Sequence, residues 1–99
     1  MLVACGSPKE ASKPDFCTAY HEVWGPHGFD QGDQVARRLW DTGAPKEIDH
    51  DAREGFKLFI GMLLSSISQA DLESRIEAAG YEDNRKVVAF RVAANSVCS

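Results

Sequence analysis

Three cysteines are the residues of this 99-residue chain with the most specific chemistry. Cys5 lies in the run LVACGS at residues 2–7, whereas Cys17 and Cys98 lie near the two ends of the remaining chain. An odd number of cysteines in an exported protein leaves one thiol to be explained. If Cys5 has a separate role, one pair remains, and a disulfide between Cys17 and Cys98 would close a loop of about 80 residues. Such a loop stabilises a domain by roughly 4 kcal/mol.

The same residues allow a second interpretation. Cys17 can be a small buried hydrophobe and Cys98 a free thiol near the end of the chain. Free thiols suit a protein of the reducing cytosol, where disulfides are rare. The use of the cysteines and the location of the protein are therefore linked predictions.

Histidines and carboxylates are the side chains that could bind a metal. His21 and His27 lie on either side of a Gly-Pro break, with Asp30 and Asp33 nearby, and a loop folding back could bring them together around zinc. No HExxH or CxxC motif accompanies them. Residues 49–60 resemble a calcium loop but lack the glycine at the sixth position and the acidic residue at the twelfth. We predict no metal and no cofactor.

Candidate nucleophiles lack the partners that catalysis needs. Ser65, Ser66 and Ser68 have no GxSxG setting and no evident histidine partner. Cys17 and His21 are spaced to meet on one helix, which could lower the pKa of the thiol, but no third group orients them. We therefore predict that the protein is not an enzyme and has no catalytic residue.

Charge argues against a nucleic-acid partner. The chain has 11 basic and 15 acidic residues, a formal charge of −4, whereas nucleic-acid binding depends on neutralising phosphates. Residues 68–90 have the spacing of a helix-turn-helix with Gly80 in the turn. Its second helix would begin near Glu82 and Asp83, which repel phosphate. No apolar run approaches the roughly 20 residues that span a bilayer, so no transmembrane helix is predicted.

The stretch from residue 49 to 67 is the strongest structural signal in the sequence, and the other helices are expected to pack around it. Its apolar residues recur at three-and-four spacing on one face of an expected helix. Asp49 can cap the start of this helix, and negative charge in its first turn is favourable. The inward stripe comprises Ala52, Phe56, Phe59, Ile60, Leu63, Leu64 and Ile67.

Four further helices are expected, at residues 14–24, 33–42, 69–79 and 84–97. Asp33 and Ser68 are the expected N-caps of two of them, and Gly43 and Gly80 the glycines that end two of them. Residues 1–13 indicate a flexible tether, and residues 14–99 a single helical domain. The fold class predicted is all-α, a bundle of four or five short helices, with a disulfide joining the N- and C-terminal helices.

Several motifs together resemble those of a known group of proteins. They are LVACGS at residues 2–7, FCTAY at 16–20, Gly43-Ala44-Pro45 before DHDAREGF, and the VVAF…VCS ending. The chain resembles small actinobacterial lipoproteins of uncharacterised function, some of them carried by actinobacterial phages. The resemblance implies an exported, helical, disulfide-bridged domain with lipid on Cys5. No catalytic residue carries over from this group.

These expectations give two functional hypotheses. In the first, Cys5 anchors an extracytoplasmic domain to the membrane, and the domain binds an envelope protein or, if phage-encoded, excludes an incoming phage through its injection machinery. Trp24, Phe29 and Trp40 are the candidate partner contacts, with ordinary core packing as their alternative role. In the second hypothesis, the protein is a cytosolic regulatory or adaptor domain with free thiols. The oligomeric state and the identity of the partner are not predicted.

Overall fold

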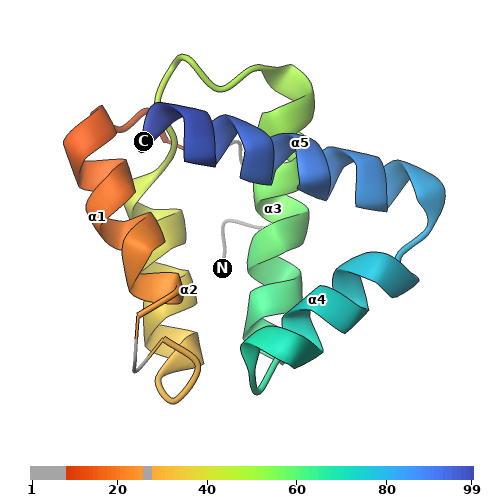
Figure 1. Cartoon of the computed structure of the whole chain (residues 1–99). Helices are drawn as coiled ribbons and strands as arrows, with labels where there is room; N and C mark the ends of the chain where they lie inside the picture. The colour runs from red at the N-terminus through yellow and green to blue at the C-terminus, as the bar shows by residue number, and fades with distance from the viewer. Residues whose placement is uncertain (1–8, 26–27) are drawn as a thin grey trace.

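The computed structural model describes residues 9–25 and 28–99, and over these ranges it contains five helices and no strand (Figure 1). The helices are α1 (Lys13–Val23), α2 (Gly32–Thr42), α3 (His50–Ser65), α4 (Gln69–Ala78) and α5 (Tyr81–Val97). In Figure 1, α1 and α2 lie side by side, and α5 runs across α3. The prediction of an all-α bundle of four or five short helices is confirmed.

The crossing of α3 and α5 is unusually close because a glycine lies at the contact. A Cβ added at Gly55 would overlap the main-chain carbonyl of Lys86, and it would lie 3.1 Å from the Cβ of Phe90. Two ion pairs flank the crossing, from Asp51 to Arg85 and from Glu54 to Lys86, with N···O distances of 2.9 and 2.6 Å.

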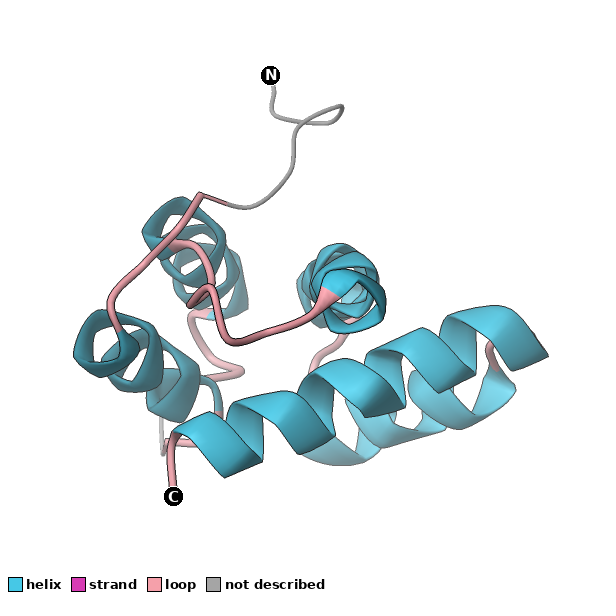
Figure 2. Cartoon of the chain, turned by 90° about the horizontal axis from the view of Figure 1, so that it is seen from above, coloured by secondary structure: helices cyan, strands magenta, loops and turns pink. Residues whose placement is uncertain are grey.

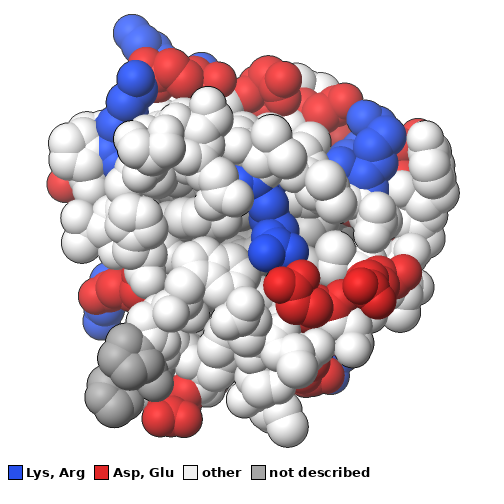
Figure 3. Space-filling view, viewed as in Figure 1, with Lys and Arg blue, Asp and Glu red and all other residues white. Residues whose placement is uncertain are grey.

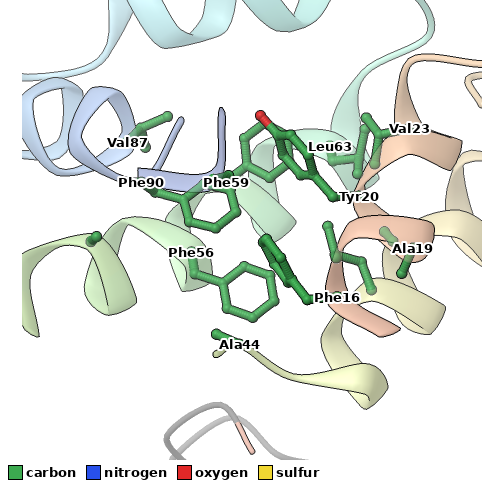
Figure 4. Packing of buried hydrophobic residues seen from close by; sticks show 14 of the residues in the cluster. Phe16, Ala19, Tyr20, Val23, Ala44, Phe56, Phe59, Leu63, Val87 and Phe90 are labelled. Atoms are coloured by element: carbon green, nitrogen blue, oxygen red, sulfur yellow. The ribbon is translucent and has the colours of Figure 1, made fainter. Parts of the chain in front are cut away.

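An aromatic cluster fills the space between α1, α3 and α5 (Figure 4). The ring of Phe56 stacks on that of Phe90 with centroids 5.0 Å apart, and Phe16 meets both rings edge-on at 6.2 Å. Tyr20 meets Phe90 edge-on at 5.9 Å and also contacts Phe59. These five side chains are almost fully buried, so the inward stripes predicted for α1, α3 and α5 converge on one core.

Side-chain caps fix several helix ends as the sequence predicts. Asp49 accepts a hydrogen bond from the main chain of Ala52 at 3.0 Å, and Ser68 accepts one from Asp71 at 3.0 Å. Asp33 is not a cap, because α2 begins one residue earlier, after Gln31, and has no side-chain cap. Gly43 follows the last residue of α2 as predicted.

The end of α3 and the start of α5 differ from the prediction. The helix α3 stops at Ser65, because Ser66 turns to an extended conformation and its hydroxyl donates to the carbonyl of Met62. Ile67 therefore leaves the inward stripe and is 82% exposed, and Leu64 is 44% exposed. Gly80 does not close α4; it precedes the first residue of α5, which begins three residues earlier than expected.

The folded unit also includes residues that the sequence assigned to the tether. Glu10 forms a parallel bridge with Ala44, and Ser12 caps α1 by accepting from the main chain of Asp15. The described chain is therefore held against the domain from Lys9 onward. Part of the segment predicted as a tether thus contacts the domain through its main chain, and side-chain patterns do not reveal such pairing.

The close crossing gives a stability prediction with a matched control. Gly55→Ala is expected to lower the free energy of unfolding by about 2–3 kcal/mol, because the new methyl group must push α5 away from α3. Gly61→Ala on the same helix meets no atom within 4 Å. It should raise stability by roughly 0.5–1 kcal/mol through helix propensity alone.

Urea denaturation of both variants measures the two changes. Equal effects of the two substitutions would contradict the account of the crossing.

Candidate functional site

A disulfide joins the first helix to the last. The sulfur atoms of Cys17 and Cys98 are 2.04 Å apart, and the Cα atoms are 5.5 Å apart. Cys17 lies in α1 beside the buried Phe16, and Cys98 caps the C-terminus of α5. The predicted pairing of the N- and C-terminal helices is confirmed, and the free-thiol interpretation of these two residues is wrong.

Two residues singled out from the sequence lie outside the described ranges. Cys5, the predicted lipid-attachment site, is one, and His27 is the other. His21 is exposed on α1, beside Tyr20, with ring centroids 6.4 Å apart.

Trp24 and Phe29, two of the three predicted partner contacts, lie together. Their ring centroids are 6.4 Å apart, and Trp24 also contacts Tyr20 and Phe59 at 6.0 and 6.2 Å. Both side chains are half-buried against the core. Trp24 and Phe29 therefore form the outer edge of the aromatic cluster and not a freely exposed pair.

Arg91 of α5 covers this edge. Its guanidinium lies 5.3 Å from the centre of the Trp24 ring, a cation–π geometry. Two of its nitrogen atoms donate to the carboxylate of Glu73 on α4, at 2.9 and 3.4 Å. The resulting group, Trp24, Arg91 and Glu73, is called the Arg91 cap below. It links α1, α4 and α5 on one side of the core.

Electrostatics in the Arg91 cap follow from burial and pairing. The hydrogen bond from Arg91 holds the pKa of the Glu73 carboxyl below its ordinary value, and the same bond raises the pKa of Arg91. Burial raises the pKa of the Tyr20 hydroxyl, and Trp24 and Arg91 oppose that shift. The guanidinium is thus a permanent cation in a mostly aromatic setting.

Trp40, the third predicted contact, lies elsewhere. Its ring packs against Phe56 of α3, with centroids 5.4 Å apart, and its side chain is half-buried. The structure therefore does not bring the three aromatic residues into one surface.

Arg91 and Glu73 were not identified from the sequence as candidate functional residues. One signal was available: Arg91 lies four residues after Val87, on the flank of the inward stripe of α5. A long cation at such a position can cover apolar surface with its stem. Its partner could not be read from spacing, because Glu73 lies on another helix.

A cluster of possible metal ligands lies at the start of α3. Ligand atoms of His50, Asp51 and Glu54 lie within 4.8 Å of one another, and the residues are partly or fully exposed. Arg85 lowers the pKa of the Asp51 carboxyl, and Lys86 lowers that of Glu54. Both carboxylates are thus used by the ion pairs that flank the α3–α5 crossing.

The candidate nucleophiles have structural roles. The sulfur of Cys17 is bonded to Cys98, so it is not a thiol that His21 could activate. Ser65 and Ser66 donate to carbonyls of the preceding helical turn, and Ser68 caps α4. Each of these four residues therefore has a structural role in the fold.

The described residues line open grooves on the surface. One of about 330 Å³ lies between α1 and α2 and includes the ion pair of Arg38 with Glu22. Another, of about 500 Å³, lies between the start of α3 and α5 and is lined by Ala52, Ala89 and Ala93 among others. Figure 3 shows the face seen in Figure 1, where a broad uncharged area separates groups of charged side chains.

Comparisons of the chain with known proteins assign no family or function to this site. No family model, curated protein or solved structure matches the chain. Among the described helices, none is long and apolar enough to cross a membrane.

The disulfide gives a second stability prediction. Replacing both cysteines, Cys17→Ser with Cys98→Ser, is expected to lower the free energy of unfolding by roughly 4 kcal/mol, because the unfolded chain regains the freedom of a long loop. Urea denaturation with and without reductant measures the loss. The wild-type protein should respond to reductant and the double variant should not. An unchanged wild-type midpoint under full reduction would contradict the prediction.

The Arg91 cap gives a pH prediction. A carboxyl whose folded pKa is depressed adds stability above its unfolded pKa, and that stability is lost as the pH falls through the folded pKa. Glu73→Gln should therefore be less stable than wild type near neutral pH, and the difference should shrink below a pH of about 4.3. Urea denaturation across this range measures both. Glu77→Gln, at an exposed position of α4, is the control and should follow the wild-type pH curve.

Proposed function

We propose that this protein is a membrane-tethered extracytoplasmic lipoprotein domain that acts by binding a partner in the cell envelope. The observation that carries the proposal is the disulfide between Cys17 and Cys98. Disulfides form and persist in oxidising compartments and are rare in the cytosol. This bond uses two of the three cysteines, which leaves Cys5, within LVACGS, for lipid attachment.

Anchoring through lipid suits the domain. A single acyl chain binds a membrane only marginally, whereas two or more hold a protein firmly. A bacterial lipoprotein carries several acyl chains on its first cysteine, so Cys5 alone would supply a stable anchor. The disulfide would stabilise this small domain in an oxidising compartment.

Binding, rather than catalysis, is supported by how the polar residues are used. The carboxylates near His50 are ion-paired, and the serines and Cys17 have structural roles. In contrast, α5 presents Val88 and Val92 to solvent, with exposed fractions of 43% and 64%. The proposed partner is an envelope protein or, for a phage-encoded copy, part of the injection machinery of an incoming phage.

Membrane fractionation tests the proposal. The full-length gene product should partition with the membrane, and Cys5→Ser should release it into the soluble extracytoplasmic fraction. The double variant Cys17→Ser with Cys98→Ser is the matched control, because it removes two sulfurs but keeps Cys5, and it should stay with the membrane. A soluble wild-type protein in the cytoplasm would contradict the proposal and favour a cytosolic adaptor.

A further inference from the structure

The chain entering α1 is fastened to the connection between α2 and α3. The main-chain N–H of Ala44 donates to the carbonyl of Lys9 at 2.8 Å, and the N–H of Ala11 donates to the carbonyl of Ala44 at 2.9 Å. We call Lys9–Ala11 with Gly43 and Ala44 the N-terminal clamp. Ala44 is fully buried, so these hydrogen bonds are shielded on the side of the core.

Glycine at position 43 is required for the clamp. Gly43 has φ of 96°, a backbone conformation that residues with a Cβ rarely adopt. A Cβ at this position would also overlap the carbonyl of Lys9. The main chain of Lys9 can therefore pass close to Gly43 only because residue 43 has no side chain. The clamp thus depends on glycine at this position.

The clamp lies on the side of the domain away from α5. Figure 2 shows α5 along one edge of the bundle, ending at the C label, and the described start of the chain at the opposite edge. The domain is about equally wide in all three directions, with extents of 32, 30 and 29 Å.

We propose that the N-terminal clamp fixes how the domain sits on a lipid bilayer, with the clamp side against the headgroups and α5 facing away. The inference rests on the proposed function, since it takes Cys5 as the lipid-bearing residue. Cys5 and Lys9 are separated by four peptide links, which reach at most about 14 Å. Crossing the headgroup layer uses roughly 5–7 Å of that length.

The remaining reach is much smaller than the domain. Only about 7–9 Å of chain is left between the headgroups and Lys9, against a domain width of 29 Å or more. The domain cannot turn over on so short a tether. If the clamp opened, the tether would run to Ser12, where α1 is capped, and its reach would rise to roughly 25 Å.

This orientation names the surface that a partner meets. The part of α5 that carries the exposed Val88 would be held away from the lipid, whereas Val92 lines the groove that α5 shares with Lys13 and Glu47. The clamp side would be unavailable to a protein partner because the bilayer covers it. The bilayer is thus the proposed occupant of the clamp face.

Fluorescence quenching on vesicles tests the orientation. The purified, oxidised protein is coupled through Cys5 to a maleimide-bearing lipid in phosphatidylcholine vesicles that contain nitroxide-headgroup lipid. An azide-bearing amino acid at the position of Asp41 or Asn95 carries the dye. Asp41 is exposed on α2 near Gly43, and Asn95 is exposed on α5. We expect strong quenching at position 41 and weak quenching at position 95.

Two substitutions open the clamp and one leaves it intact. Gly43→Ala introduces the overlap with Lys9, and Ala11→Pro removes the donor to Ala44 without adding bulk at Gly43. Either should bring the quenching at the two positions close together, while the helix content measured by circular dichroism is retained. Gly61→Ala, in open space on α3, is the control and should keep the wild-type ratio.

The outcomes separate this inference from the proposed function. Equal quenching at both positions in the wild-type protein, or an unchanged ratio in Ala11→Pro, would overturn the clamp orientation. Neither result bears on whether cells attach lipid to Cys5, because the coupling is chemical. In the fractionation experiment, a wild-type protein that does not partition with the membrane would contradict the proposed function, whatever the quenching on vesicles shows.

Discussion

The close approach of α3 and α5 at Gly55 is the constraint on which the other contacts depend. These are the two longest helices, and no side chain separates their main chains at the crossing. That distance allows the rings of Phe56 and Phe90 to stack, and it sets the spacing at which Asp51 and Glu54 reach their cations. The remaining helices pack onto this pair.

α1 is held to the pair by contacts of three different kinds. Phe16 and Tyr20 insert between α3 and α5 as part of the aromatic cluster, and Cys17 is bonded to the end of α5. At its outer end, Trp24 lies under Arg91, which Glu73 holds in place. An apolar contact, a covalent bond and a charged cap thus hold one short helix and the residue that ends it.

The helices could be predicted because each carries a local signal. The three-and-four stripe around Phe56 and the cap at Asp49 are properties of neighbouring residues, and both are present in the structure. Ile67 was misplaced because periodicity does not show where a helix stops, and the stop depends on a hydroxyl turning back to Met62. The pairing of Cys17 with Cys98 could be predicted only on the assumption that Cys5 carries a lipid, because three cysteines alone do not select one pair.

Features that depend on tertiary packing or on main-chain groups could not be predicted. The contact between Glu73 and Arg91 requires α4 and α5 to fold against each other, and no spacing along one helix encodes it. The clamp uses carbonyl and N–H groups that every residue carries, so Lys9 and Ala11 have no side-chain signature. Gly43 was recognised as a helix end, although it also accommodates the main chain of Lys9.

The disulfide also determines how the domain carries mechanical load. Tension applied at Lys9 first strains the hydrogen bonds to Ala44 and then passes into α1. From Cys17 it has a direct covalent route to Cys98, at the end of α5. Once the hydrogen bonds to Ala44 have broken, a pull between the start of the chain and its last helix is therefore borne by a short covalent path through Cys17 and Cys98.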